Sequence, residues 1–271
     1  MLDSAEIIAL CRAEHGDPYA VLGMHTDADG KLWVRSLQPG ALAVAVLEAK
    51  TGRLVAELEA REIEDVEGFF EGVMPRRRSN FPYRLRITWA SGVQETDDPY
   101  RFWTVLGEMD VWLLAEGSHL RPFERLGAHL CEIDGVAGTA FAVWAPDAQR
   151  VSVVGDFNTW DGRRHQMRLR RECGVWEIFL PGVSAGAHYK YEIRARDGNL
   201  LPLKADPYGF QSEMRPSTAS IVCALPPPVE PSASPAGDQL DAPLSVYGVH
   251  LASWRRADDG GFPDWQRISE T

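Results

Sequence analysis

The sequence predicts an all-β protein: two tandem immunoglobulin-like β-sandwiches, followed by a linker and one further strand. Three observations predict this architecture. Short runs of alternating apolar and polar residues recur between glycines and prolines, a block of about a hundred residues occurs twice, and a proline-rich stretch follows the second block. With 271 residues, 45% of them hydrophobic, the chain can build a core in each sandwich.

The internal duplication rests on three motifs that recur in the same order at nearly the same spacing. A single match would be weak evidence, whereas three ordered matches predict a repeated structural unit. The matched pairs are Asp97–Phe102 with Lys204–Phe210, whose prolines are 207 − 99 = 108 residues apart; Gly68–Pro75 with Gly174–Pro181, 181 − 75 = 106 apart; and Phe81–Ile87 with Ala187–Ile193, 193 − 87 = 106 apart.

The first copy, residues 1–110, begins with a short helix and continues as strands. Either Asp3 or Ser4 can cap the helix, because both side chains accept a hydrogen bond from the first turn. A hairpin is expected around residues 50–52, where Lys-Thr-Gly separates two apolar runs. Residues 83–88 alternate apolar and polar side chains, which predicts a half-buried strand.

The second copy, residues 111–225, follows an irregular or partly helical connector over 102–124. Its strands are predicted by the same alternation, and Pro146 stops one of them because proline cannot donate to a ladder. Residues 155–158 then turn the chain, which places Trp160 at a loop tip. The expected strands cover 141–144, 151–154, 176–180 and 189–193.

After the second copy the composition changes. Leu225–Pro235 is rich in proline and small residues, so residues 226–243 are expected to form a semi-rigid linker. Ser245–Trp254 then predicts one new buried strand. Because a lone strand cannot bury both faces, residues 244–271 are expected to be the start of a further domain whose remainder is missing from the chain.

The charge and the cysteines exclude several functions. The net charge of −11 argues against nucleic acid and against an anionic membrane surface as partners, and it is compatible with a neutral ligand. The four cysteines form no Cys-x-x-Cys pair, so no metal and no cofactor are expected, and the thiols are expected to be free. The acidic N-terminus lacks the pattern of a signal peptide, and we expect a cytoplasmic protein.

The loop that carries Trp160 has two interpretations. The indole can close the core of the sandwich, because large aromatic side chains supply much of the buried area in cores. Alternatively, it can serve as a flat platform for the C–H face of a sugar ring. The sequence leaves both open, and Lys190, on an alternating strand, has a solvated strand face as its structural alternative.

Several of these motifs resemble one family. Residues 15–25 resemble the opening motif of bacterial 1,4-α-glucan (glycogen) branching enzymes of the α-amylase superfamily. Residues 141–146 and 155–160 resemble the glycogen-binding sandwich that branching and debranching enzymes share, and 247–254 resembles the first strand of the catalytic (β/α)8 barrel. The chain is thus similar to the N-terminal region of a branching enzyme, truncated before the catalytic residues. Tandem sandwiches are the more specific sign, since debranching and trehalose-forming relatives usually carry one.

The resemblance implies a reaction that this chain is not expected to perform alone. Branching enzymes cleave an α-1,4 bond and rejoin the chain through an α-1,6 bond with retention, using one carboxylate as nucleophile and another as acid/base. In the family both carboxylates lie on later barrel strands. None of the 39 acidic residues here lies in a matching motif, so no catalytic residue is expected.

The resemblance also implies contacts to α-1,4-glucan or glycogen, and the missing barrel is a further possible partner. The second sandwich resembles the glycogen-binding domain of the AMP-activated kinase β subunit, in which two tryptophans and a lysine hold the sugar. Trp160 matches the first tryptophan and Lys190 the lysine, and Asn158 is a third candidate contact. Leu200 stands at the place of the second tryptophan, so binding is expected to be weak.

Two alternatives remain open at this point. The sandwiches can form a structural module that docks another protein, or the chain can be the N-terminus of a debranching enzyme or trehalohydrolase. A glycan site requires Trp160 to be accessible with Lys190 beside it, and this requirement separates the first alternative from the glucan-binding prediction.

Overall fold

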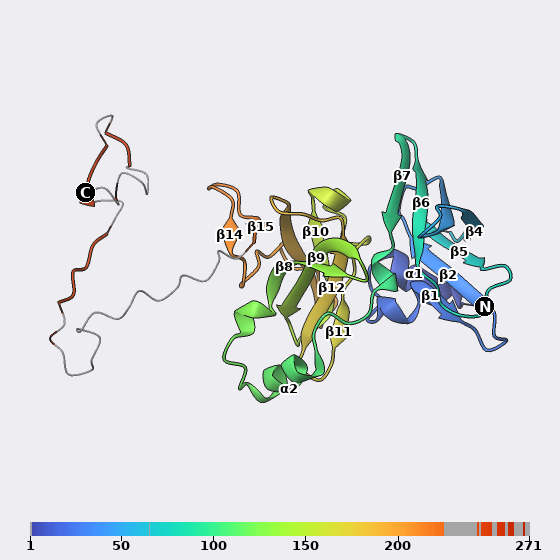
Figure 1. The fold of residues 1–271 in the computed structure, drawn as a ribbon, viewed down its shortest axis with the longest axis horizontal. Helices are drawn as coiled ribbons and strands as arrows, with labels where there is room; N and C mark the ends of the chain where they lie inside the picture. Colours follow the sequence, from blue (N-terminus) through green and yellow to red (C-terminus); the bar gives the residue numbers. More distant parts are fainter. Residues whose placement is uncertain are drawn as a thin grey trace. The chain divides into compact units, whose positions relative to one another are not determined.

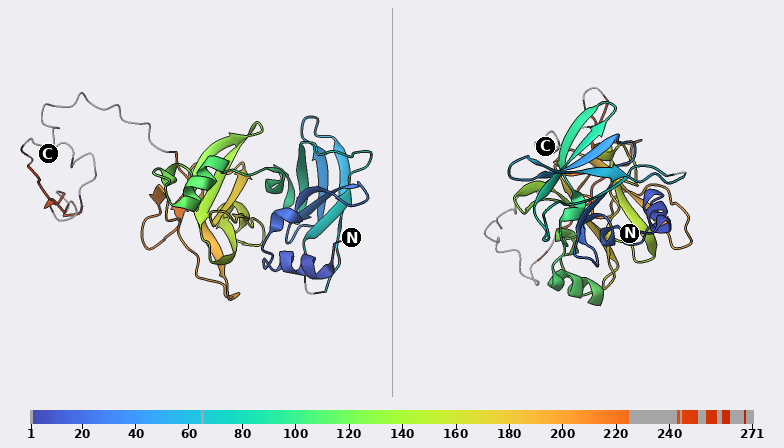
Figure 2. Two further views of the ribbon diagram at one scale, coloured as in Figure 1. Left: turned by 90° about the horizontal axis from the view of Figure 1, so that it is seen from below. Right: turned by 90° about the vertical axis from the view of Figure 1, so that its right-hand side faces the viewer.

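The computed structural model describes residues 2–64, 66–224, 243, 245–250, 254–257, 260–262 and 268. The chain divides into two compact units, Met1–Leu225 and Pro226–Thr271. The first unit contains both copies of the repeat, and each copy forms a β-sandwich, as Figures 1 and 2 show. The prediction of an all-β protein with two sandwiches is confirmed.

The first sandwich is built from sheets that are joined through one strand. Its strands follow the order β1-β2-β5-β4-β3-β6-β7, and β4 pairs with β3 along most of its length and with β5 at its end. The facing strands enclose a core that includes Val34, Val46 and Leu85. The elements are α1 (Ser4–Cys11), η1 (Pro18–Ala20), β1 (Gly23–Thr26), β2 (Leu32–Leu37), β3 (Ala43–Glu48), β4 (Leu54–Ala60), β5 (Phe69–Val73), β6 (Tyr83–Trp89), β7 (Gly92–Asp97) and η2 (Pro99–Arg101).

The second sandwich has two four-stranded sheets, β11-β12-β9-β8 and β10-β13-β15-β14. Phe141, Trp176 and Tyr191 are fully buried between them. Its elements are α2 (Glu108–Glu116), η3 (Pro122–Glu124), β8 (Gly127–Ile133), β9 (Val136–Trp144), β10 (Ala148–Gly155), η4 (Asp156–Asn158), β11 (Arg168–Arg170), β12 (Val175–Pro181), β13 (His188–Ala195), β14 (Gln211–Ser212) and β15 (Ser220–Ile221).

The repeated Asp-Pro-Tyr motif performs the same structural task in both copies. Each aspartate is buried, accepts a hydrogen bond from a tyrosine hydroxyl of a core strand and accepts another from the backbone N–H two residues on. A buried carboxylate requires such partners, which explains why the motif recurs with its tyrosine strand. The bonds are Tyr83 Oη to Asp98 at 2.6 Å and Tyr100 N to Asp98 at 3.0 Å in the first copy, and Tyr189 Oη to Asp206 at 2.7 Å and Tyr208 N to Asp206 at 2.8 Å in the second.

The structure extends the duplication to the segments before the strands. His15–His25 and His119–His129 share a histidine, a proline, an aromatic residue, Leu-Gly and a second histidine, all at the offset 129 − 25 = 104. In both segments Nε2 of the second histidine donates to the leucine carbonyl three residues earlier, at 2.8 Å and 3.0 Å. The helices α1 and α2 precede these segments. The duplicated unit therefore runs from helix to Asp-Pro-Tyr.

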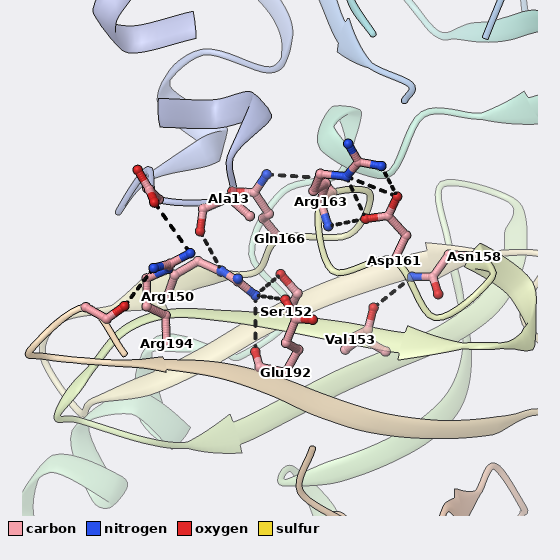
Figure 3. A network of polar contacts seen from close by, with 12 residues as sticks. Ala13, Arg150, Ser152, Val153, Asn158, Asp161, Arg163, Gln166, Glu192 and Arg194 are labelled. Carbon is pink, nitrogen blue, oxygen red and sulfur yellow. Dashed lines mark hydrogen bonds and ion pairs between the residues drawn. The ribbon is translucent and has the colours of Figure 1, made fainter. Parts of the chain in front are cut away.

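A buried arginine joins the two sandwiches. Arg150 of β10 is 1% exposed, and its Nε donates to the carbonyl of Ala13 behind α1 at 2.9 Å. Its Nη1 donates to Ser152 Oγ at 2.9 Å and pairs with Glu192 Oε1 at 2.8 Å (Figure 3). Beside it, Gln166 Nε2 donates to the carbonyl of Leu10 at 3.1 Å. The end of α1 is thus anchored on the outer face of the second sandwich.

The strand expected over 245–254 is not formed in its described part. Residues 245–250 are not in a strand, and Val246 and Tyr247 are 84% and 79% exposed. The described part of the second unit holds no strand that could pair with them, and a strand requires such a neighbour. The start of a barrel is therefore not seen, and most of the expected linker lies outside the described residues. No helix in the described ranges has the length and apolar character that crossing a membrane requires.

Candidate functional site

The loop after β10 holds Trp160 in a defined position. Thr159 and Trp160 both have left-handed backbone, with φ of 56° and 59°, so the chain turns sharply at the indole. Trp160 N donates to the carbonyl of Gly155 at 3.0 Å, and Nε1 donates to Asp156 Oδ1 at 2.9 Å. The indole is half-buried and is not among the side chains packed on the sandwich core, whereas Phe157 is. Phe157 thus closes the core, and Trp160 lies outside it.

The structure corrects the assignment of Asn158 as a substrate contact. Asn158 is 1% exposed, and its amide is committed within the chain. Oδ1 accepts from Gly155 N at 2.9 Å, and Nδ2 donates to His165 Nδ1 at 3.0 Å. Nδ2 also donates to the carbonyl of Val153 at 2.8 Å (Figure 3). Asn158 therefore holds the turn that presents Trp160, and it has no accessible polar group to offer a sugar.

Lys190 lies on the outer face of β13. Its neighbours Tyr189 and Tyr191 point into the core, so the alternation of the strand directs the lysine outward. Lys190 Nζ donates to Thr218 Oγ1 at 2.7 Å. Thr218, which the sequence argument did not single out, therefore adds a hydroxyl beside the ammonium group. Both groups can exchange hydrogen bonds with a polyol.

Asp156 connects the indole to the strand that carries Lys190. Its Oδ1 accepts from the indole, and its Oδ2 lies 3.6 Å from Nδ1 of His188. His188 precedes Lys190 by two residues on the same face of β13. Trp160 and Lys190 therefore belong to one surface on the outer side of the β10–β13 pair, as the glycan-binding interpretation requires. This surface, Trp160 with Asp156, His188, Lys190 and Thr218, is called the Trp160 surface below.

The Trp160 loop is packed firmly against the sheet beneath it. A Cβ built on Gly162 would lie 2.0 Å from Oε1 of Glu192, so a side chain at this position would have to displace the Glu192 carboxylate. Glu192 in turn pairs with Arg150, which reaches the first sandwich. This close contact holds the loop against β13, and a surface that is ordered before binding costs less conformational entropy when a ligand binds.

Leu200 also faces outward at the far end of β13. It forms a bridge with Arg194 and is 55% exposed, and the nearby Leu203 is 41% exposed. These side chains offer apolar contact but not the flat ring face of an aromatic residue. Leu200 therefore stands at the place of the second tryptophan without offering a ring on which a sugar could stack.

The corresponding loop of the first sandwich offers no comparable surface. Glu48, at its start, pairs with Arg77 at 2.6 Å, and the Arg77 guanidinium lies over the Phe81 ring at 4.4 Å. The middle residue of the basic run 76–78 is thus engaged in structural contacts. Among the described residues no cluster of His, Cys, Asp or Glu could hold a metal ion.

His165, underneath the Trp160 loop, is held neutral. Burial is the main cause that lowers its pKa from 6.5 to about 4, and the neighbouring Arg164 adds to the effect. Asn158 Nδ2 donates to Nδ1, which leaves the ring proton on Nε2. The loop therefore rests on an uncharged ring at neutral pH.

Comparison with protein families places this geometry in a known class. Residues 125–209 match the model of carbohydrate-binding module 48 (isoamylase N-terminal domain), so the second sandwich is a module of that class. Residues 3–100 match the model of the alpha-1,4-glucan branching enzyme GlgB, N-terminal domain. Together the two models match the N-terminal region of a glycogen branching enzyme, and the resemblance stated from the sequence is confirmed.

The solved structures to which the chain is similar include pullulanases. The chain is 19% identical to pullulanase type I from Bacillus subtilis str. 168 complexed with maltose, with a TM-score of 0.33 over 76% of this chain and 27% of that one. It is 17% identical to a maltotriose complex of the PulA-G680L mutant from Klebsiella pneumoniae, with a TM-score of 0.31 over 71% and 23%. The chain thus spans about a quarter of the length of these structures.

Proposed function

We propose that the second sandwich binds α-1,4-glucan at the Trp160 surface, and that it does so as the N-terminal part of a branching enzyme of glycogen synthesis. The observation that carries the proposal is the fixed indole outside the core, with Lys190 and Thr218 on the same face. An aromatic face stacks on the C–H groups of a glucose ring, and the ammonium and hydroxyl groups bond its hydroxyls.

In the proposal the chain binds substrate and leaves the transfer reaction to groups outside the described residues. Two carboxylates, Asp156 and Glu213, lie beside His188, and both are engaged within the sandwich: Asp156 accepts from the indole and Glu213 accepts from the backbone N–H of Ala219. Retaining glucan transfer requires two carboxyl groups about 5 Å apart at the reacting bond, and the proposal gives these two carboxylates a structural role instead. A cytoplasmic location belongs to the proposal, and the four free thiols support it.

A second candidate is the corresponding part of a debranching enzyme. The family model that residues 125–209 match is also that of the isoamylase N-terminal domain, which favours this candidate. The branching-enzyme match over residues 3–100 supports the first candidate instead.

The first prediction concerns Trp160. Trp160→Ala is expected to weaken binding of glycogen about tenfold, since it removes the stacking face while Phe157 keeps the core closed. Affinity electrophoresis in gels containing glycogen measures the dissociation constant. The matched control is Trp144→Ala, which removes a 61% exposed tryptophan at the end of β9, away from the Trp160 surface. Equal retardation of wild type and Trp160→Ala would show that Trp160 does not contribute to glycogen binding.

A further inference from the structure

A second exposed tryptophan lies on the opposite sheet. The segment after η2 crosses the outer face of β11 and β12, where Glu177 Oε2 accepts from Leu106 N at 2.7 Å and Arg170 Nη1 donates to Leu106 O at 3.0 Å. Phe102 is buried against Phe179, and the next residue, Trp103, is 81% exposed. The backbone that carries this indole is therefore fixed on both sides.

Arg168 supports the indole from beneath. Its guanidinium carbon lies 3.8 Å from the centre of the Tyr19 ring and 5.3 Å from that of Trp103. A guanidinium between two rings is held by cation–π attraction to both of them. One face of Trp103 is thus turned to Arg168, and the other remains in solvent.

Trp103 borders a groove with a volume of about 470 Å³. Segments from three parts of the chain line it: the residues around η1, the segment after Trp103, and β11 with the turn that follows. This volume lies within the range of small-ligand sites, about 300–1,000 Å³. The groove is separate from the Trp160 surface, which lies on the sheet formed by β10 and β13.

The charges of the groove favour a neutral ligand. Three carboxylates and three guanidinium groups line it, so the formal charge is 3 − 3 = 0. Such a balance gives no net attraction to a phosphate or another anion, in contrast to a basic patch. Planar charged side chains can bond neighbouring hydroxyls of a sugar in pairs. The groups are Asp17, Glu108, Glu172, Arg168, Arg170 and Arg171.

We propose that this groove, with Trp103 as its stacking face, is a second binding surface for α-glucan. The choice of glucan rests on the function proposed above for the Trp160 surface; the neutral, hydroxyl-bearing character of the ligand rests on the groove alone. Two weak surfaces, one on the outer side of the β10–β13 pair and one where η1 of the first sandwich meets β11, let the pair of sandwiches hold two segments of a branched glucan. Binding to the polymer then exceeds binding to a short chain, because the second contact forms at high effective concentration.

The test is oxidation of the exposed tryptophans of the whole chain by N-bromosuccinimide, with and without maltoheptaose, followed by proteolysis and mass spectrometry of the peptides that carry each tryptophan. At a maltoheptaose concentration three times the dissociation constant, about a quarter of the sites remain free, so oxidation of both Trp103 and Trp160 is expected to slow about fourfold. Trp112 of α2, 54% exposed and outside the groove, serves as the internal control and is expected to react at an unchanged rate.

The outcomes separate the two proposals. Protection of Trp103 supports the groove, whether or not Trp160 is protected. Protection of Trp160 alone keeps the proposed function and overturns the groove, and absence of protection at both overturns both. In glycogen gels, Trp103→Ala added to Trp160→Ala is expected to remove the remaining retardation, whereas Trp112→Ala in the same background leaves it unchanged. An unchanged mobility with Trp103→Ala would also overturn the groove.

Discussion

At the scale of single residues, the Trp160 loop depends on buried polar groups that do not touch a ligand. Asn158 satisfies Gly155 N and the carbonyl of Val153, and it bonds the neutral ring of His165. Leaving such groups unsatisfied costs about 1–3 kcal/mol each. The sequence placed Asn158 near the site but could not decide its role, because asparagine favours both turns and ligand contacts.

His165 gives the second prediction. Its pKa is about 4 in the folded chain and 6.5 as a free side chain, so below pH 6.5 the unfolded chain binds more protons. Stability is therefore expected to fall by about 1–3 kcal/mol as the pH drops from 6.5 to 4. His165→Gln keeps an acceptor for Asn158 and is expected to lose this dependence, as measured by urea unfolding.

The buried carboxyl group of Asp98 changes stability with pH in the opposite direction. The effect of His165 must therefore be measured as the difference between wild type and a variant. Burial raises its pKa from 3.8 to about 6, so between these values the folded chain binds more protons and stability rises as the pH falls. The difference between wild type and His165→Gln cancels this contribution, which both share. Parallel pH curves for the two proteins would contradict the assignment of a neutral His165.

At the scale of elements, the two helices end in the same backbone conformation, at residues of different type. Ala13 follows α1 and Gly117 follows α2 at the offset 117 − 13 = 104, and both are left-handed, with φ of 53° and 72°. Glycine adopts this backbone freely, whereas alanine pays about 1 kcal/mol. The sequence showed the repeat in its strands, where residue types recur. It did not reveal the repeat in the helices, because their residue types differ.

The third prediction compares these two positions. Gly117→Ala is expected to lower the free energy of unfolding by about 1 kcal/mol, and only through its backbone, since a Cβ there meets nothing within 4 Å. Ala13→Gly is expected to change it by less than about 1 kcal/mol, because the relieved backbone offsets the loss of a buried methyl group. Urea unfolding measures both. Losses of equal size would contradict the equivalence of the two caps.

At the scale of the whole first unit, the joint between the sandwiches depends on buried charge. Sequence patterns predicted both sandwiches and their order, since alternation and turns are local signals. They could not predict that Arg150 would bond Ala13, because that contact joins residues 150 − 13 = 137 apart. The position of Lys190 relative to Trp160 was anticipated only through the resemblance. The roles of Thr218 and His188 follow from contacts between elements distant in the sequence.

Arg150 gives the last prediction. Arg150→Ala is expected to lower the free energy of unfolding by about 3–5 kcal/mol. The substitution leaves the carboxylate of Glu192 without its charged partner and removes the hydrogen bond to the end of α1. The control is Arg194→Ala, whose guanidinium lies 3.5 Å from the half-exposed Glu14 across the same joint, with an expected loss below about 1 kcal/mol. Urea unfolding at neutral pH measures both. Similar losses would show that the joint does not depend on the buried pair.

The duplication has a consequence for the symmetry of the pair. The sandwiches are joined head to tail, because the end of the first helix meets the flank of the second sandwich through Arg150 and Gln166. The same helix end recurs in the second copy, where Trp112, Leu120 and Phe123 are 54%, 93% and 41% exposed. Tyr19, the counterpart of Phe123 in the first copy (123 − 19 = 104), packs against the core of the second sandwich, so a position that is covered in the first copy is open in the second. The two sandwiches thus follow one another like neighbouring repeats in a short stack, and the exposed apolar side chains lie at the α2 end of that stack.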